Sequence, residues 1–420
     1  MSVARRARAL VDVDHPGLVW LMSLNHGFNE FYSIIVPPLF PLLRQDLGIG
    51  YADTSLLVVV FFATYSIAQL PVGRVANHYS ARRLLVGGQA LLSVGIALVA
   101  FAPTYETMLA GMVVAGVGGS TYHPTGMSVI SDAESDSTHG RSMGIHGMLG
   151  TFGTVVAPVV VGGLAVAYGW RPALLAGAGA GLAFAAALAV LYPRAVPGGE
   201  EETTLLAALR ESMGGGTLRT AGSRAFSFLR SPPMLVLIGL FAVVGAEVRA
   251  VQSFTTLFAA NVASADGAST DAATSFGNQM FALTMVAAGV ASTAAGAGVD
   301  RMDRRLFAGA CFAGTAVVVA AVSLLPLGRV GLAVGFAVLG VVMYSVYPAT
   351  NALAAGLSTE DSSGDVFAVT QTAAALGGAA GPFILGFVAD ATTLSLGFLS
   401  TAGIAGVGVL VVAAATVLEA

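Results

Sequence analysis

Apolar runs long enough to cross a lipid bilayer recur from one end of this sequence to the other. A helix of about 20 apolar residues spans the hydrocarbon layer, and over such a run only a helix satisfies its own backbone polar groups. Just 10% of the 420 residues are charged, whereas soluble domains carry about 25%. The sequence therefore predicts an all-α membrane protein with twelve transmembrane helices, near residues 17–43, 53–76, 83–102, 105–131, 141–167, 171–192, 234–260, 274–299, 306–325, 330–357, 365–389 and 394–418.

A long polar break divides these predicted helices into two sets of six. We expect an N-terminal six-helix bundle over residues 1–192, a cytoplasmic linker over residues 193–233, and a C-terminal six-helix bundle over residues 234–420.

The two halves carry matching glycines and prolines. The stretch GVGGSTYHPTG, which begins at Gly116, aligns with GVVMYSVYPAT, which begins at Gly340, at an offset of 224 residues. The same offset pairs Pro124 with Pro348. Internal repeats of this kind are typical of transporters whose two bundles are related by an axis normal to the membrane.

The distribution of arginine predicts the orientation. All 19 basic residues are arginine, and with the N-terminus inside, 15 of them fall on the cytoplasmic side. Arg44, Arg171 and Arg329 fall outside, and Arg249 lies within a helix. Because cytoplasmic loops carry the excess of positive charge, we expect a multi-pass protein of the cell membrane with both termini in the cytoplasm.

The motifs of several other protein classes are missing from the sequence. There is one cysteine, Cys311, and no lysine, so neither a multi-cysteine metal site nor a phosphate-binding loop with its lysine is present. We expect no enzyme activity, no cofactor, no metal and no nucleic-acid partner. The expected partners are the lipid bilayer, protons and a small molecule, and the expected state is a monomer.

Ionisable side chains interrupt the first and fourth predicted helices. His26 and Glu30 are four residues apart, so they share a helix face with Cβ atoms about 6 Å apart. His123 precedes Pro124, which removes a backbone hydrogen bond and permits a bend. Ionisable groups at membrane depth are costly and often mark a proton path. We expect Glu30 to carry a proton, with His26 and His123 relaying it. The alternative is that His26 and Glu30 form a helix-packing hydrogen bond and that His123 is a packing residue at a kink.

Other polar side chains are candidates for substrate contact. Arg249 and Gln252 lie on one polar stripe of the seventh helix, and Arg249 could serve instead as an ion-pair gate. His146 could face the cavity or a helix interface. The full set of predicted substrate-binding residues is Asn25, Asn29, Tyr32, His146, Arg249, Gln252, Tyr344, Tyr347, Asn351 and Gln371.

Two loops resemble the signature of the major facilitator superfamily, a Gly-x-x-x-Asp-x-x-Gly-Arg-Arg pattern after the second helix of each half. The predicted gating-loop residues are Gly73, Asn77, Arg82 and Arg83 in the first copy, where Asn77 replaces the acid, and Gly296, Asp300, Arg304 and Arg305 in the second. The alternative is that these arginines only set the topology. The sequences GTVVAP, Gly153 to Pro158, and GGAAGP, Gly377 to Pro382, are similar to the glycine-proline pattern of antiporters in this superfamily.

Within that superfamily the chain resembles the fosmidomycin-resistance type of drug exporter. The segments that carry this resemblance are LNHGFNEFYSIIVPPLFPLL from Leu24, STYHPTG from Ser120 and GRSMGIHGMLGTFGTVVAP from Gly140. The resemblance implies the major facilitator fold and a proton-coupled antiporter that exports a small amphiphilic or anionic compound by alternating access. Two alternatives stay open: a proton symporter that imports a carboxylate or nutrient, and a non-transporting membrane receptor.

Overall fold

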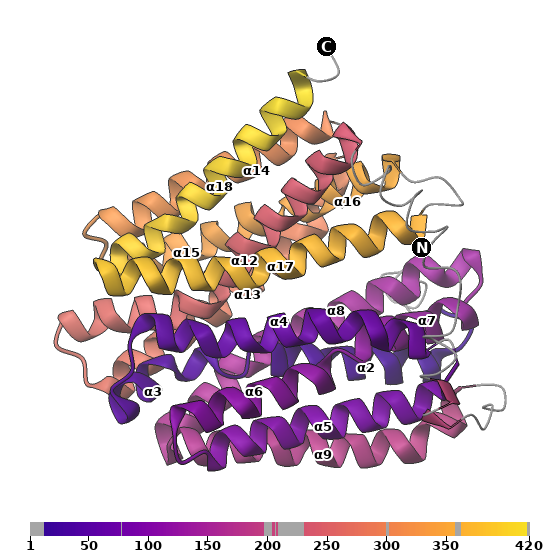
Figure 1. Cartoon of the computed structure of the whole chain (residues 1–420). Coiled ribbons are helices and arrows are strands. Elements are labelled where there is room, and N and C mark those ends of the chain that lie inside the picture. Colours follow the sequence, from indigo (N-terminus) through magenta and orange to yellow (C-terminus); the bar gives the residue numbers. More distant parts are fainter. Residues whose placement is uncertain are drawn as a thin grey trace, which may run out of the picture. The chain divides into compact units, whose positions relative to one another are not determined.

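The computed structural model describes residues 12–76, 78–196, 204–205, 207–208, 231–299, 302–357 and 363–417. Its regular elements are all helical in these residues (Figure 1). In the first half they are α2 (Pro16–Ser33), η1 (Pro37–Leu39), α3 (Phe40–Leu47), α4 (Tyr51–Ala76), α5 (Ala81–Phe101), α6 (Tyr105–Gly119), α7 (Tyr122–Ala133), α8 (Asp136–Tyr168) and α9 (Trp170–Ala195). In the second half they are α12 (Pro232–Ala265), α13 (Thr270–Val299), α14 (Arg304–Leu324), α15 (Arg329–Tyr344), α16 (Val346–Leu357), α17 (Ser363–Ala391) and α18 (Leu394–Val417).

Three predicted spans are interrupted close to prolines, and two of these breaks occupy equivalent places in the repeat. In the first span, α2 ends at Ser33 and a 3-10 turn begins at Pro37 before α3 continues the chain. In the fourth span the break lies between α6 and α7, and Pro124 is the third residue of α7. The tenth span breaks in the same way between α15 and α16, and Pro348 is the third residue of α16. A proline has no N–H to donate to the preceding turn, so each break falls where a backbone bond is lost.

Nine helices in the described part of the chain are long and apolar enough to cross a membrane. The eighth span, α13, is not among them. The first is not among them either, since α2 carries the polar row that includes His26 and Glu30. The fourth is not among them either, because the break leaves α6 with 15 residues. The predicted fold class, an all-α membrane protein with the twelve-helix arrangement, is confirmed.

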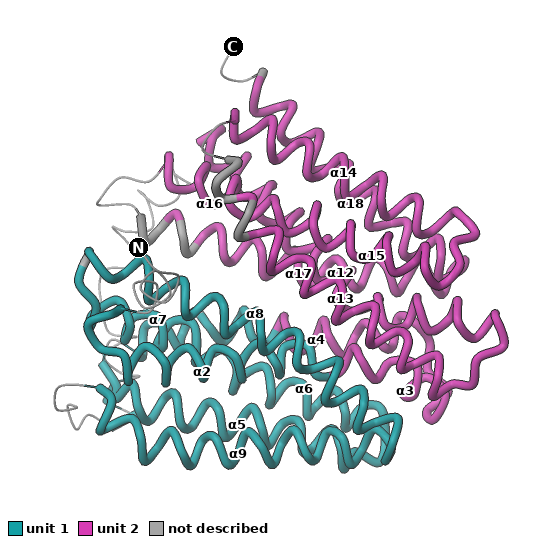
Figure 2. The backbone as a smooth tube through the Cα atoms, turned by 180° about the vertical axis from the view of Figure 1, so that it is seen from behind, with its two compact units in different colours: residues 1–35, 64–215 teal, residues 36–63, 216–420 magenta. Residues whose placement is uncertain are grey.

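The chain divides into two compact units, coloured separately in Figure 2. One contains residues 1–35 and 64–215, and the other contains residues 36–63 and 216–420. The segment 36–63, which belongs to the first half of the sequence repeat, therefore packs with helices of the second half. Within the second unit, Phe40 meets Phe254 edge to face, with ring centroids 5.7 Å apart.

The carboxylate of Asp390, near the end of α17, holds the start of α4 inside this second unit. It accepts hydrogen bonds from the backbone N–H groups of Tyr51 (2.8 Å) and Ala52 (2.7 Å). These donors have no partner within their own helix, because the first N–H groups of a helix never do. Gly50 lies directly against this carboxylate, since a Cβ atom there would come within 2.7 Å of Asp390 Oδ2.

Glycine lets equivalent pairs of helices in the two units pack backbone against backbone. A Cβ atom on Gly377 of α17 would overlap the carbonyl oxygen of Ala242 on α12, and one on Gly153 of α8 would overlap the carbonyl oxygen of Gly27 on α2. Gly153 and Gly377 are equivalent in the sequence repeat. Small residues permit such close helix approach in membranes, so the glycine-proline segments serve helix packing in both units.

Two carboxylates join the start of α2 to the start of α8. Asp14 Oδ2 accepts from the Ser135 backbone N–H (3.1 Å), the Ser135 hydroxyl (2.6 Å) and the Thr138 hydroxyl (2.9 Å). Glu134 in turn accepts from the backbone N–H groups of Asp14 (3.1 Å) and His15 (2.7 Å). Each acid thus satisfies N-terminal donors of the other helix, and a negative charge there also suits the helix dipole.

The Asp14 contacts predict an acid-dependent loss of stability. The hydroxyl and backbone bonds from Ser135 lower the pKa of Asp14 from 3.8 to about 2. Because the pKa is lowered on folding, the stabilisation is complete above the unfolded value and is lost as the pH falls through the folded value. We expect Asp14→Asn to lower the melting temperature at pH 6, and the difference from the wild type to vanish as the pH approaches 2. A difference that is independent of pH would contradict this role.

Candidate functional site

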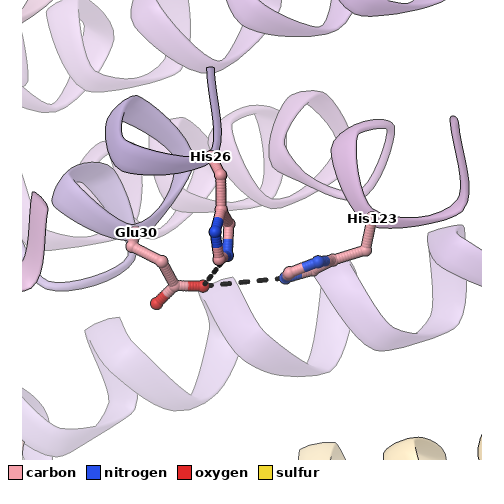
Figure 3. A group of neighbouring side chains, drawn as sticks. All are labelled: His26, Glu30 and His123. Carbon is pink, nitrogen blue, oxygen red and sulfur yellow. Dashed lines mark ion pairs between the residues drawn. The ribbon is translucent and has the colours of Figure 1, made fainter. Parts of the chain in front are cut away.

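Two histidines from different helices meet one carboxylate in the first unit. Glu30 Oε1 lies 3.7 Å from His26 Nε2 on its own helix, α2, and 3.6 Å from His123 Nε2 on α7 (Figure 3). The i,i+4 spacing places His26 beside Glu30. The break between α6 and α7 places His123 in the second residue of a new helix, so its ring reaches the same carboxylate. The exposed fraction of the side chain is 12% for His26, 18% for Glu30 and 29% for His123. The cluster is therefore partly accessible to solvent.

The ring of His26 is held by a hydrogen bond and by a stacked ring, with a second aromatic ring beside it. His26 Nδ1 lies 2.9 Å from the backbone oxygen of His146. The His146 ring stacks on it with centroids 3.9 Å apart, and the Tyr122 ring lies parallel at 5.4 Å. Tyr122 donates its hydroxyl to the Met22 carbonyl (2.6 Å) and has His146 Nδ1 at 3.3 Å. His146 is buried, and its contacts orient His26.

The remaining predicted polar residues of α2 lie inside the bundle. Asn25, Asn29 and Tyr32 are all buried. Asn29 donates to the Gly119 carbonyl at the end of α6 (2.9 Å), and Tyr32 donates to the Gly177 carbonyl of α9 (2.6 Å). These bonds hold helices together, and they do not support the predicted substrate contact of these residues.

The second unit contains a connected polar chain that begins at Arg249 of α12. Arg249 Nη1 donates to Gln252 Oε1 (2.9 Å), and Gln252 Nε2 donates to the Tyr344 hydroxyl (2.5 Å). The Tyr344 hydroxyl lies 3.4 Å from Met285 Sδ. The guanidinium of Arg249 sits over the ring of Phe62, 4.3 Å from its centroid. Arg249 and Gln252, predicted on one polar stripe, therefore form one network with Tyr344 of α15.

The other predicted residues of the second half lie apart from that chain of bonds or at its edge. Tyr347 packs beside Tyr344, with ring centroids 5.6 Å apart. Asn351 on α16 and Gln371 on α17 are exposed in their unit.

The loop arginines bind helix carbonyls, as expected for cations at helix C-termini. Arg82 donates to the Ala189 carbonyl, Arg304 to that of Ala352 (3.2 Å) and Arg305 to that of Ala415 (3.4 Å). Arg83 is exposed and its backbone N–H is capped by Ser80 (3.2 Å). Gly73 lies against Pro124, with 3.6 Å between a Cβ built there and the proline Cβ. Gly296 lies in α13, whereas Asn77 and Asp300 fall outside the described residues.

Sequence reasoning missed several residues of these two networks. Tyr122 could have been predicted, because it is adjacent to His123 in an apolar segment and a buried tyrosine usually hydrogen-bonds through its hydroxyl. Phe62 and Met285 carry no such signal. Glu247 is a separate case: its side chain is fully buried in α12, and neither carboxylate oxygen has a hydrogen-bond partner among the residues that the structure describes. It makes no pair with Arg249, as the two-residue spacing predicts.

Comparisons with known proteins identify the family. Residues 20–277 match the model of the Major Facilitator Superfamily. The fosmidomycin resistance protein of Escherichia coli is 25% identical over 153 residues, which are 36% of this chain and 37% of that protein. A multidrug resistance protein B homolog of Mycobacterium tuberculosis is 28% identical over 168 residues, 39% of this chain and 31% of that protein. The matches thus span about a third of these relatives.

Solved structures show the same fold over nearly the whole length. A bacterial homolog of the human lysosomal transporter Spinster, in an inward-facing and occupied conformation, superposes with a TM-score of 0.78 at 15% identity, covering 99% of this chain and 98% of that one. The nucleoside transporter NupG gives 0.72 at 15% identity, with 95% and 99% covered. The family match, together with the helical fold shared with these structures, shows that this chain belongs to the Major Facilitator Superfamily.

Proposed function

We propose that this transporter is a proton-coupled antiporter that exports a small anionic or amphiphilic compound from the cell by alternating access. The observation that carries the proposal is the meeting of His26 and His123 on the carboxylate of Glu30, at 3.7 and 3.6 Å. Ionisable groups that cluster within a membrane bundle commonly form a proton relay.

The contacts of His26 favour a proton at this place. A backbone carbonyl can only accept, so His26 Nδ1 carries the hydrogen that bonds His146. In a neutral ring, Nε2 then presents a lone pair to Glu30, and two lone pairs face each other. A proton between Nε2 and the carboxylate removes this repulsion, and His123 offers a second nitrogen to pass it on.

The network around Arg249 suits the negatively charged part of a substrate. A guanidinium presents several N–H donors in a fixed plane and pairs well with carboxylate or phosphate groups. The Phe62 ring under the guanidinium and the Tyr344–Tyr347 pair add apolar surface. A compound with an anionic head and an apolar body fits this set of side chains.

Flux measurements on the intact protein test the proposal. Fosmidomycin, a small phosphonate anion, is the probe, because a relative of this chain is named for resistance to it. Proteoliposomes loaded with fosmidomycin are placed in acidic or alkaline buffer. Efflux that is faster with acid outside supports antiport. Efflux that is faster only with acid inside indicates a symporter, and binding without flux indicates a receptor.

Arg249→Gln is expected to weaken fosmidomycin binding by about 10- to 100-fold. A hydrogen bond to a charged group contributes about 1.5–3 kcal/mol, which corresponds to that range. Thermal stabilisation of the purified protein by the ligand measures the affinity. Arg329→Gln is the control, because Arg329 lies in α15 over Phe276, outside the Arg249 network. Equal affinities of the two variants would exclude Arg249 from anion binding.

A further inference from the structure

We infer that His26, Glu30 and His123 form a binding site for a divalent transition-metal ion of the zinc type. Within the part of the chain that the structure describes, they are the one group of three metal-ligating side chains whose donor atoms all lie within 4.8 Å of one another. The sequence predicts no metal, since its only local sign is a histidine four residues before a glutamate. The third ligand comes from α7, almost 100 residues later in the chain.

The donor geometry is close to that of a bound ion. Zinc binds nitrogen and carboxylate oxygen at about 2.0–2.2 Å, so neighbouring donors in a tetrahedral site are about 3.3–3.5 Å apart. The two nitrogen-to-oxygen distances are 3.7 and 3.6 Å. A shift of a few tenths of an ångström brings these two pairs to the bound spacing. All three side chains are partly exposed, which leaves room for a rotation of His123 and for a water molecule as fourth ligand.

The surroundings of His26 match those of a metal-bound histidine. Such a ring almost always donates its second nitrogen to a carbonyl or carboxylate, which fixes the tautomer and points the other nitrogen at the metal. His26 Nδ1 makes this contact with the His146 carbonyl at 2.9 Å, and the His146 ring stacked at 3.9 Å fixes its plane. His26 Nε2 therefore faces Glu30 as a ready donor.

The ligand set selects the type of ion. Two imidazoles and one carboxylate suit zinc, cobalt and nickel, whereas magnesium and calcium prefer sites made of oxygen alone. A bound ion would tie α7 to α2 through His123 and Glu30. The inference goes beyond the proposed function, because binding requires neither a substrate nor a gradient.

Cobalt is the probe for the test, since its visible absorption distinguishes a low-coordinate protein site from the hydrated ion. Purified full-length protein in detergent is titrated with Co²⁺, and Zn²⁺ is then added to displace it. We expect one Co²⁺ per chain, visible absorption bands of a low-coordinate site, and complete displacement by Zn²⁺. Glu30→Gln and His123→Gln are each expected to weaken Zn²⁺ binding by more than about 100-fold, because changes that only touch a ligand's outer contacts already cost about 10- to 100-fold.

His78→Gln is the matched control, since His78 is an exposed imidazole outside the cluster. It is expected to bind both ions like the wild type. Monodisperse elution and an unchanged melting temperature without metal establish that each variant is folded. Absence of Co²⁺ bands in the wild type, or equal Zn²⁺ affinity in Glu30→Gln and the wild type, would overturn the inference. Neither result bears on proton-driven flux, which is measured separately.

Discussion

Glu30→Gln is expected to reduce substrate efflux driven by a pH gradient to the rate of protein-free vesicles. Glutamine has nearly the shape of glutamate and can still accept the hydrogen bond that Ser33 Oγ gives Glu30 Oε2 at 3.3 Å. It cannot gain or lose a proton near neutral pH. The variant should therefore still bind substrate while losing the coupling of substrate flux to proton movement. Parallel measurements of fosmidomycin efflux and internal pH in proteoliposomes check this expectation.

Glu106→Gln is the control for this experiment, because Glu106 is an exposed carboxylate in the first turn of α6. It should transport at the wild-type rate. Proton-driven efflux at a normal rate in Glu30→Gln would remove Glu30 from the coupling mechanism. Loss of ligand binding in the same variant would instead assign Glu30 to the substrate site.

Gly377→Ala is expected to destabilise the second unit strongly. The added methyl group would overlap the carbonyl oxygen of Ala242, which belongs to the backbone of α12 and cannot rotate away. Overpacking of a well-packed core typically lowers the free energy of unfolding by about 1–3 kcal/mol. Because the clash here is with a backbone carbonyl, we expect a loss at the upper end of this range or above it. We expect a clearly lower melting temperature and a lower yield of folded protein. Gly153→Ala should act in the same way through Gly27 of α2 in the first unit.

Gly406→Ala provides the comparison for this prediction. Gly406 lies within α18, and a Cβ atom there would meet nothing within 4 Å. Alanine favours a helix over glycine by about 1 kcal/mol, so this variant should be neutral or slightly more stable. Melting temperatures of the purified proteins in detergent compare the two sites. Equal melting temperatures for Gly377→Ala and Gly406→Ala would contradict the close contact of α12 and α17.

The sequence predicts the helices well, because apolar length and proline positions act locally. The repeat also predicts that the breaks before Pro124 and Pro348 are equivalent. Its limits appear where partners come from distant segments. The i,i+4 rule places His26 next to Glu30, but no local pattern shows that His123 reaches the same carboxylate from α7.

Residue type alone also does not separate the roles of the polar residues on α2. Asn29 and Tyr32 were expected to contact substrate, yet their side chains bond carbonyls at the ends or interior of neighbouring helices. The polar side chains of this helix lie in two places: some pack inside the bundle, and others face the His26–Glu30–His123 cluster. Only the packing of α2 against its neighbours distinguishes them, and packing depends on the whole fold.

The carboxylate of Asp390 links the end of α17 to the first turn of α4. The two oxygens of this one carboxylate accept from two consecutive backbone donors, so both bonds depend on the position of a single side chain. Separation of the two helices would break both hydrogen bonds, and water would then have to solvate the first turn of α4. A rearrangement that moves the start of α4 away from α17 therefore loses two backbone contacts through the displacement of one residue.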